Sequence, residues 1–351
     1  MRILIKGTNW IGDAVMSTPA ARQIRSAFPG SFIALHTRNW AKGVFGDTDL
    51  FDEIVAFEPA GSKIRTVIEQ SRILRGYSFD MAVLLPNSFE SALMVALAGI
   101  PLRLGYRTDG RRILLTDSLP VPEWKSSRHE SEFYSNLADF VIRVMGRVTS
   151  KGASTSLLSL SRERKRYAIE HLGSIGVAQG GPLIAIGPGS TNSMAKRWPT
   201  EYFAKLCDEF SRSLDAQILL LGSASETDVG QVLSDLSIAK IHDLTGKTDL
   251  HMAMGILASA NLFVSNDMGL AHIAAGLGTP TLTLFGPTNE VATAPLGPNA
   301  RFVREVVECS PCMLRECPID HRCMRLLQPE RVFEVAVGML QNRSQSNDSS
   351  N

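Results

Sequence analysis

The chain has 351 residues, which is too many for one small core and suits two domains of ordinary size. Its 36 Lys and Arg residues nearly balance 35 Asp and Glu residues, so a net charge of +1 argues against a nucleic-acid partner. No apolar run is long enough to predict a membrane-spanning helix, and residues 1–6 are too short for a signal peptide. Five cysteines without a secretory signal predict free thiols and a cytoplasmic location.

Short apolar segments alternate with amphipathic segments through the first half of the chain. Strands are predicted at 2–6, 32–37, 54–57, 79–85 and 103–106, and helices at 13–28, 63–74 and 91–98. This alternation is typical of an open, doubly wound, parallel α/β sheet. The loop GTNWIG at 7–12 lacks the GxGxxG fingerprint, which disfavours a dinucleotide-dependent dehydrogenase.

The same alternation starts again in the second half, after a Ser-rich stretch at 149–161 that predicts a linker. Strands are predicted at 182–187, 217–221, 261–265 and 281–285, and helices at 162–172, 199–211, 228–236, 250–258, 269–275 and 329–341. We therefore expect one domain over 1–160, a second over 176–328, and a ligand cleft between them. The helix at 329–341 could pack back onto the first domain, and 342–351 predicts a disordered tail.

The loop after the strand at 182–187 carries groups that suit a nucleoside diphosphate. Gly187 and Gly189 let the backbone approach a ligand closely, and Ser190 and Thr191 add hydroxyls. Lys196, just past the loop, could neutralise charge on a departing phosphate. The plain alternative is a turn followed by a surface lysine.

Two further strand ends point to the same kind of ligand. Glu226 follows the strand at 217–221, where a carboxylate can accept hydrogen bonds from a ribose diol. Asp267 and His272 flank the start of the helix at 269–275, whose free N–H groups favour phosphate. Each could instead be a surface or capping residue, but together they predict a nucleotide-diphosphate site.

Asp13 directly follows Gly12 in the loop after the first strand, where a carboxylate would face the cleft. It could act as a general base on an acceptor hydroxyl. The alternative is an N-cap for the helix predicted at 13–28, a common role for Asp. Trp10 could wall the cleft or pack under the loop.

Several motifs stand in one order along the chain: NWIGDAVM at 9–16 with TPA at 18–20, GPGS at 187–190, KRWP at 196–199, NDMG at 266–269 with His272, and FGPT at 285–288. They resemble the bacterial lipopolysaccharide heptosyltransferases of glycosyltransferase family 9, over residues 1 to about 340. The segment with CSPC at 309–312 and CPIDHRCM at 317–324 resembles the subfamily of heptosyltransferase II in particular. The resemblance implies a GT-B fold, in which two Rossmann-like parallel-sheet domains face a central cleft.

The same resemblance implies an inverting, metal-independent transfer from an ADP-heptose donor to the inner-core heptose of a nascent lipopolysaccharide, without a cofactor. Asp13 would be the base and Lys196 would stabilise the leaving diphosphate. Glu226 would hold the ribose. The nucleotide and phosphates would be held by Gly187, Gly189, Ser190, Thr191, Asp267, Met268, Gly269 and His272.

Four cysteines, Cys309, Cys312, Cys317 and Cys323, lie close together in the sequence and could hold a structural zinc ion. Reduced packing thiols, or reversible pairing, are the favoured alternatives, because zinc sites usually separate two C-x-x-C pairs by a longer gap.

A phosphorylated, acidic acceptor requires cations, for which a solvated basic face is the plain alternative. The candidates in the first half are Lys63, Arg65, Arg103, Arg107, Arg111 and Arg112, with Trp10 and His129 as residues that could line the acceptor side. Basic and amphipathic segments could also contact the cytoplasmic face of the inner membrane.

Three other functions remain open from the sequence: addition of the first or third heptose, a nucleotide-sugar epimerase of GT-B shape, and a nucleotide-binding protein without catalysis. Asp13 separates an enzyme from a binding protein, because binding alone does not require a base at that position.

Overall fold

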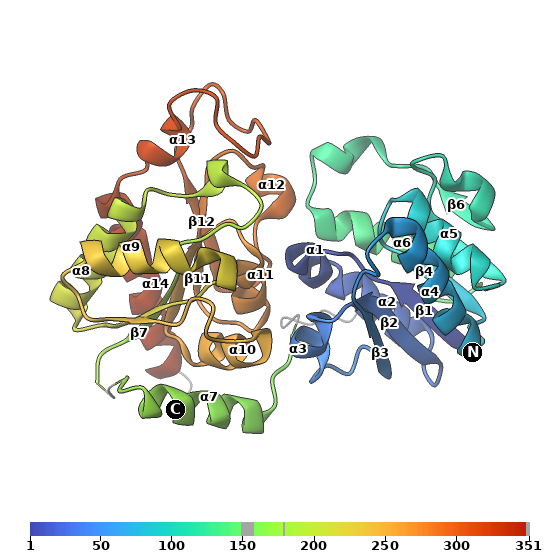
Figure 1. Cartoon of the computed structure of the whole chain (residues 1–351), viewed down its shortest axis with the longest axis horizontal. Coiled ribbons are helices and arrows are strands. Elements are labelled where there is room, and N and C mark those ends of the chain that lie inside the picture. Colours follow the sequence, from blue (N-terminus) through green and yellow to red (C-terminus); the bar gives the residue numbers. More distant parts are fainter. Residues whose placement is uncertain (149–157, 178–179, 349–351) are drawn as a thin grey trace. The chain divides into compact units, whose positions relative to one another are not determined.

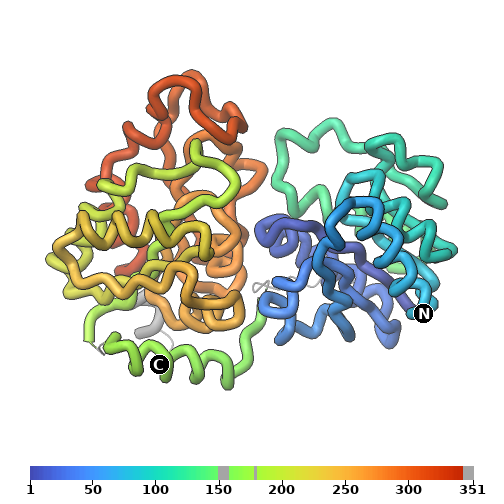
Figure 2. Tube along the Cα trace, in the orientation of Figure 1, coloured from blue at the N-terminus to red at the C-terminus, as the bar shows by residue number. Residues whose placement is uncertain are grey.

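The computed structural model describes residues 1–148, 158–177 and 180–348. It divides into two compact units, Met1–Leu158 and Ser159–Asn351, which are drawn as a ribbon in Figure 1 and as a Cα trace in Figure 2. The linker predicted at 149–161 lies largely outside the described residues, since 149–157 are not among them. Each unit is an α/β layer structure and is described by itself.

The first unit is built on a six-stranded parallel sheet with the order β3-β2-β1-β4-β5-β6. Its strands are β1 (Arg2–Lys6), β2 (Phe32–Arg38), β3 (Glu53–Phe57), β4 (Met81–Leu84), β5 (Leu102–Tyr106) and β6 (Asp117–Leu119). The apolar runs of β1 and β4 are buried because helices cover both faces of the sheet. The strand order reverses between β1 and β4, which makes this the topological switch point of the sheet.

The helices of this unit are α1 (Ile11–Met16), α2 (Thr18–Ala27), α3 (Ala41–Phe45), α4 (Lys63–Gly76), α5 (Phe89–Leu97) and α6 (Glu130–Val144), with short 3₁₀ turns η1 (Arg111–Leu114) and η2 (Glu123–Ser126). The single helix predicted over 13–28 is two helices that divide at Ser17. Pro19 explains the division, because it has no N–H to continue the ladder of α1 but is well accommodated in the first turn of α2. Helix α6 packs on α2, and α4 packs on α5.

The second unit repeats this topology with a six-stranded parallel sheet of order β12-β11-β10-β7-β8-β9. Its strands are β7 (Leu183–Gly187), β8 (Gln217–Leu220), β9 (Ile241–Asp243), β10 (Leu262–Asn266), β11 (Thr281–Phe285) and β12 (Ala300–Arg304). Its helices are α7 (Arg162–Ser174), α8 (Thr200–Leu214), α9 (Thr227–Leu236), α10 (Leu250–Ser259), α11 (Gly269–Gly276), α12 (Glu290–Thr293), α13 (Arg322–Arg325) and α14 (Pro329–Asp348), with 3₁₀ turns η3 (Met194–Lys196) and η4 (Ala224–Glu226). The switch point of this sheet lies between β7 and β10.

Helix α14 belongs to the core of the second unit. Val332, Ala336 and Met339 are buried with residues of β7, β8 and β10, and the helix contacts α8 and β10. The apolar stripe of the helix is therefore buried within this unit. The helix also runs to Asp348, into the tail for which the sequence predicted disorder.

Across the described ranges 1–148, 158–177 and 180–348, no helix is both long enough and apolar enough to span a membrane.

Candidate functional site

The predicted donor residues of the second unit meet at its switch point. Gly187 at the end of β7 is in register with Ser265 on the neighbouring strand β10. The loop after β7 and the loop after β10 therefore leave the sheet side by side, at the edge where open α/β sheets bind ligands. A Cβ on Gly187 would lie 2.7 Å from the sulfur of Met268, so glycine is required for this close approach.

Lys196 and Asp267 form the charged centre of this site. The Lys196 Nζ donates to Asp267 Oδ2 at 2.7 Å, and the Thr288 hydroxyl donates to the same oxygen at 2.9 Å. The Asp267 side chain is 7% exposed and that of Lys196 is 26% exposed, so the ion pair is shielded from bulk water but reachable from one side. One of the three Nζ donors is used by Asp267, which leaves two for an anion.

Asn266 fixes the geometry of the two loops, a role that the sequence analysis did not assign. Its Nδ2 donates to the carbonyl oxygens of Pro188 and Gly189 at 2.8 and 3.2 Å, and its Oδ1 accepts from the Trp198 N–H at 2.9 Å. The side chain is fully buried, so these bonds are strong constraints. The NDMG motif carried the family resemblance, but its asparagine was given no role of its own.

Glu226 is buried beneath the Gly-rich loop. Its Oε2 accepts from the N–H and hydroxyl of Ser223, at 2.7 and 2.8 Å, as part of a capping box. Its Oε1 lies 3.4 Å from the Thr191 hydroxyl, and a Cβ on Gly189 would lie 2.1 Å from the same oxygen. The carboxylate therefore lies beside Gly189 and Thr191, and it also holds its own loop together.

Helix α11 completes this edge with its free N-terminus. Gly269 is its first residue, Met268 precedes it in an extended conformation, and His272 is buried one turn later. Ser190 is buried, and its carbonyl oxygen accepts from Arg197 Nε at 3.3 Å. The predicted donor residues thus lie at the end of β7, on loops or in the first turns of helices, at the carboxyl edge of one sheet.

Asp13 lies in the first turn of α1, at the corresponding edge of the first unit. The exposed Trp10 occupies the N-cap position, so Asp13 is not the N-cap that the alternative interpretation predicted. The pKa of the buried Tyr134 on α6 is raised well above its ordinary value by burial, and further by the negative charge of Asp13. Asp13 is half-buried.

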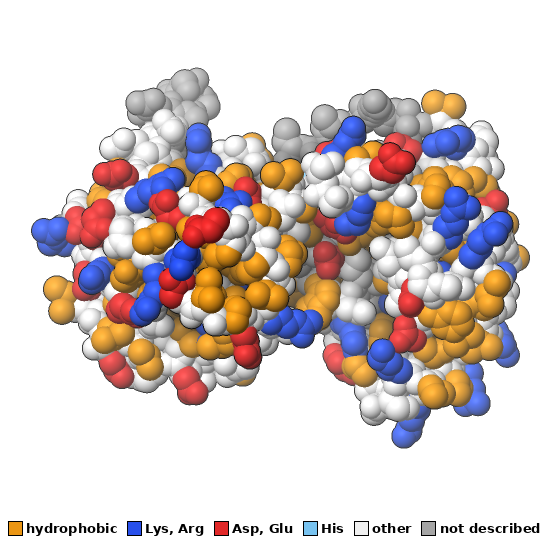
Figure 3. Space-filling view, turned by 90° about the horizontal axis from the view of Figure 1, so that it is seen from above, with side chains coloured by type: hydrophobic (Ala, Val, Ile, Leu, Met, Phe, Trp, Pro, Cys, Tyr) orange, Lys and Arg blue, Asp and Glu red, His pale blue; other side chains and the backbone are white. Residues whose placement is uncertain are grey.

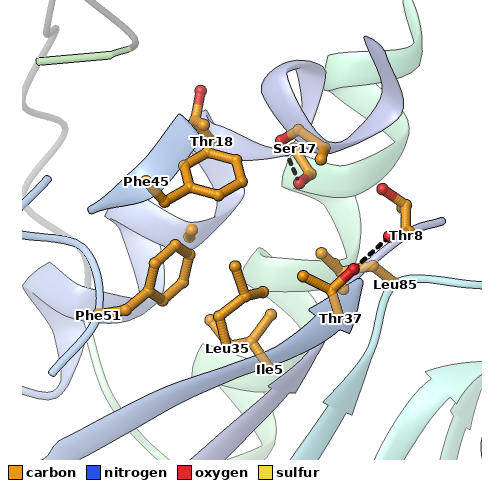
Figure 4. A pocket seen from close by; sticks show the side chains of 12 residues that line it. Ile5, Thr8, Ser17, Thr18, Leu35, Thr37, Phe45, Phe51 and Leu85 are labelled. Carbon is orange, nitrogen blue, oxygen red and sulfur yellow. Dashed lines mark hydrogen bonds between the residues drawn. The ribbon is translucent and has the colours of Figure 1, made fainter. Parts of the chain in front are cut away.

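A small cavity beneath α1 and α2 is shown in Figure 4. Its lining is mostly apolar, including Ile5, Leu35, Phe45 and Phe51, and its volume of about 10 Å³ is at the limit for one water molecule. The nearby Thr37 hydroxyl donates to the carbonyl oxygen of Thr8 at 2.6 Å, which fixes the start of the loop after β1. The cavity is a packing defect and is too small to hold a sugar.

A buried lysine ends strand β1. The Lys6 Nζ donates to the carbonyl oxygens of Gly7 and His36, and burial together with the charge of Arg38 lowers its pKa to about 7. Burial, with the charge of Lys6, also lowers the pKa of His36 to about 3. His36 stacks on Phe57, and Lys6 and Arg38 each lie 5.3 Å from the centre of that ring. The sequence analysis assigned no role to this cluster.

The predicted acceptor residues are in mixed environments. Lys63 and Arg65 are exposed and pair with Glu90 and Glu69. Arg107 is exposed just after β5. His129 is the N-cap of α6, where its Nδ1 accepts from the Ser131 N–H at 3.1 Å. On the face seen in Figure 3, basic side chains lie among hydrophobic ones on the first unit.

Two of the arginines that the sequence offered as acceptor-binding cations, Arg103 and Arg111, do not belong to an exposed basic face. Arg103 donates to the carbonyl oxygens of Ile100, Pro101 and Leu114, at the amino end of β5 and away from the switch point. Arg111 is fully buried, and burial lowers its pKa to about 10. Both side chains donate to backbone carbonyl oxygens, and Arg111 also donates to the side chains of Ser91 and Asn87.

The cysteine-rich segment, residues 308–323, connects two parts of the donor site. On one side Ala195 N–H donates to the Arg315 carbonyl at 2.9 Å, and His321 Nε2 lies 2.6 Å from the Ala195 carbonyl. On the other side Met313 N–H donates to the Pro287 carbonyl at 2.8 Å. The segment therefore braces η3, which carries Lys196, against the loop that carries Thr288.

The four cysteines of this segment are free. Cys323 is buried, and its thiol pKa is raised to about 11 by burial and by the neighbouring thiols Cys309, Cys317 and Cys312. In the part of the chain that the structure describes, no three His, Cys, Asp or Glu side chains are arranged to hold a metal ion. The cysteines are thus neighbours in space without forming a metal site in this structure.

The chain is similar in sequence and in fold to known proteins. The family model of glycosyltransferase family 9 (heptosyltransferase) matches residues 67–322. Lipopolysaccharide heptosyltransferase 2 of Escherichia coli K12 is 31% identical over 97% of this chain and 99% of the relative. The solved structure of E. coli ADP-heptose lps heptosyltransferase II superimposes with a TM-score of 0.82 at 28% identity, covering 98% of this chain and all of that one. The glycosyl transferase family 9 structure from Veillonella parvula shares the fold, with a TM-score of 0.84 at 22% identity over 97% of each chain.

The two six-stranded parallel sheets with their flanking helices match the GT-B type of glycosyltransferase, and the sequence match spans most of both units. The chain therefore belongs to glycosyltransferase family 9, the heptosyltransferases, and is a glycosyltransferase.

Proposed function

We propose that this enzyme transfers heptose from ADP-heptose to the first inner-core heptose of lipopolysaccharide, with inversion at the anomeric carbon. The observation that carries the proposal is the likeness to lipopolysaccharide heptosyltransferase 2 over nearly the full length of both chains. The donor site supports it, because a cation, a helix N-terminus and a Gly-rich loop gather at one strand edge.

The second unit would bind the ADP part of the donor. Lys196 keeps two donors for the diphosphate while the third holds Asp267, and the N-terminus of α11 adds oriented N–H groups. Glu226 would accept from the ribose hydroxyls beside Gly189. Asp267 acts as a positioning residue that fixes the Lys196 ammonium group.

Asp13 would supply the chemistry. Its carboxylate takes the proton from the acceptor hydroxyl as that oxygen forms a bond to the anomeric carbon of heptose. The bond from that carbon to the diphosphate oxygen breaks on the opposite face, and ADP leaves with the electron pair. Lys196 and the backbone N–H groups stabilise the negative charge that develops on the leaving phosphate.

The experiment compares Asp13→Asn with wild type on ADP-heptose and inner-core acceptors of defined length, with products read by mass spectrometry. We expect kcat to fall by about 10²–10⁴ because the amide cannot accept the proton. Asp139→Asn, an exposed change on α6, is the matched control. Near-normal transfer by Asp13→Asn would refute the base assignment.

The same assay separates the remaining alternatives. Transfer to a heptose-free acceptor only would identify addition of the first heptose, and a requirement for a longer core would identify the third. Conversion of the donor sugar without any acceptor would identify an epimerase, and nucleotide binding without turnover would identify a binding protein.

We also propose that the first unit contacts the cytoplasmic face of the inner membrane, where a lipid-linked acceptor would lie. Ile64 and Ile113 are 74% and 84% exposed, and each has basic neighbours in the sequence, Lys63 and Arg65 or Arg112. Exposed apolar side chains flanked by cations suit an anionic lipid surface. Sedimentation with anionic vesicles, but not with neutral ones, is the expected result, and equal recovery with both would contradict it.

A further inference from the structure

The two units have the same strand order, and their switch points correspond. In the second unit the switch lies between β7 and β10, and the loops after these strands carry the donor site. In the first unit it lies between β1 and β4, where Leu85 N–H donates to the Lys6 carbonyl at 3.1 Å. The loop after β1 leads to Asp13. The loop after β4, Pro86-Asn87-Ser88, leaves the sheet beside it, at the position where such sheets bind ligands.

Arg111 holds this second loop in one conformation. Asp109 and Gly110 both have left-handed backbone conformations, and the turn brings Arg111 back beneath the sheet edge. Its guanidinium donates to the carbonyl oxygens of Pro86 and Ser88 and, at 3.1 Å, to the Ser91 hydroxyl. Arg111 also donates to the Tyr106 carbonyl at 2.8 Å, so the loop is anchored to the end of β5.

The contact between Arg111 and Asn87 determines which way the amide of Asn87 faces. Arg111 Nη2 donates to Asn87 Oδ1 at 3.3 Å, and a guanidinium can only donate. The oxygen of the amide must therefore face Arg111, and Nδ2 must face away from it. The Asn87 backbone is fixed separately, since its carbonyl accepts from the Thr108 hydroxyl at 2.8 Å.

The amide nitrogen of Asn87 has donors to offer at this edge. The side chain is half-buried, and no hydrogen bond from Nδ2 is found among the residues that the structure describes. Two N–H donors are thus presented, in a fixed orientation, on the loop next to the one that leads to the proposed base. Sugar hydroxyl, carboxylate and phosphate oxygens all accept such bonds.

We propose that Asn87 is a substrate-binding residue whose amide N–H groups donate to an oxygen of the acceptor sugar, and that Arg111 is the positioning residue that orients it. This inference rests on the proposed function, because it assumes that the acceptor reaches Asp13. Arg111 itself does not touch the acceptor.

Asn87→Asp is the decisive variant. It keeps the oxygen that Arg111 bonds, now with a full charge, but removes both N–H donors. If Asn87 serves only to hold the loop, this change preserves or strengthens that role. If it binds the acceptor, the KM for the acceptor rises by about tenfold while the KM for ADP-heptose stays the same and Tm is unchanged or higher.

Three further variants accompany it in the same assay, with a soluble inner-core saccharide as acceptor. Asn342→Asp adds the same charge at an exposed position on α14 and is expected to leave both KM values unchanged. Asn87→Ala is expected to raise the acceptor KM without an added charge. Arg111→Lys, which cannot make the same set of bonds, is expected to raise the acceptor KM and lower Tm.

An acceptor KM within twofold of wild type in both Asn87 variants would overturn the inference, as would a rise in the donor KM instead. Wild-type enzyme that binds ADP-heptose but transfers nothing to the saccharide would overturn the proposed function, and this inference with it. Normal wild-type transfer with unchanged Asn87 variants would overturn the inference alone.

Discussion

The switch-point edges of the two units differ in the partners of their cations. In the second unit, the cation Lys196 is paired with the buried carboxylate of Asp267, which also accepts from Thr288. In the first unit, the buried cations Lys6 and Arg111 bond only to neutral oxygens among the described residues. Two sheets with one topology thus present one edge with balanced charge and another with buried positive charge.

This difference indicates what each edge can bind. The carboxylate of Asp267 compensates the charge of Lys196 and keeps its ammonium group in a fixed position, where the proposed diphosphate would bind. In the first unit, Lys6 is buried without a carboxylate hydrogen-bond partner among the described residues, which disfavours its charged form and lowers its pKa to about 7. Under the proposed function, the acidic acceptor would bind at this edge and Asp13 would act there as the base.

The largest effect is expected from breaking the ion pair. Lys196→Ala should lower kcat by about 10²–10³, because the developing charge on the leaving diphosphate loses its cation. It should also lower the free energy of unfolding by about 1–3 kcal/mol, because Asp267 stays buried without its ionic partner. Steady-state kinetics and urea unfolding measure the two effects.

The double variant Lys196→Ala/Asp267→Asn sharpens the comparison. Replacing the unpaired carboxylate of Asp267 by an amide should restore most of the free energy of unfolding but none of the activity. Lys240→Ala, an exposed change, should alter neither quantity. If the double variant is no more stable than Lys196→Ala, the unpaired charge of Asp267 is not the cause of the lost stability.

A smaller effect is expected when a side chain is added to the Gly-rich loop. Gly189→Ala places a Cβ 2.1 Å from Glu226 Oε1, so either the loop or the carboxylate must move. We expect the KM for ADP-heptose to rise by about tenfold, with a stability loss of about 1–3 kcal/mol. Gly173→Ala in α7, where an added Cβ meets nothing within 4 Å, should be neutral or slightly stabilising. An unchanged donor KM in Gly189→Ala would show that the Glu226 contact is not part of the donor site.

The smallest effect concerns stability alone, in the first unit. Lys6 has a folded pKa of about 7 against an ordinary value of 10.5, so between these values the unfolded chain binds a proton that the folded chain does not. Stability should therefore rise with pH across this window, by up to about 1.4 kcal/mol per pH unit. Lys6→Met removes this dependence, and its stability relative to wild type should be greatest near pH 7 and decline toward pH 10. Urea midpoints at several pH values measure it, and parallel curves for the two proteins would contradict a lowered Lys6 pKa.

Most strands follow from local apolar patterns, but the short strands β6, β9 and β12 were not predicted because they carry little apolar sequence. The run TLTLF, for example, forms the strand β11. The Gly-rich loop at 187–191 begins at the carboxyl end of β7, beside β10. The missed helix α6 also carries a local signal, since Phe133, Leu137 and Val141 repeat at a helical spacing and are all buried. The division of the helix at Ser17 could have been derived from Pro19 alone.

Other features depend on partners that are distant in sequence. The ion pair of Lys196 joins residues 71 positions apart, and no local pattern reveals it. Arg111 looks like a surface cation in the sequence, but Gly105 leaves room for its guanidinium beneath the sheet edge. The apolar stripe of α14 likewise packs against α8, a partner that the local sequence pattern does not identify.

The brace formed by residues 308–323 has a consequence for local unfolding. Its hydrogen bonds tie Ala195 on one side and Pro287 on the other, so the two walls of the donor site cannot open independently while the brace is folded. The segment and both walls then form one cooperative unit, with a common opening free energy. A nucleotide bound between the walls would lower the population of that open state in all three segments together, even though Ala195 and Pro287 lie about ninety positions apart in the chain.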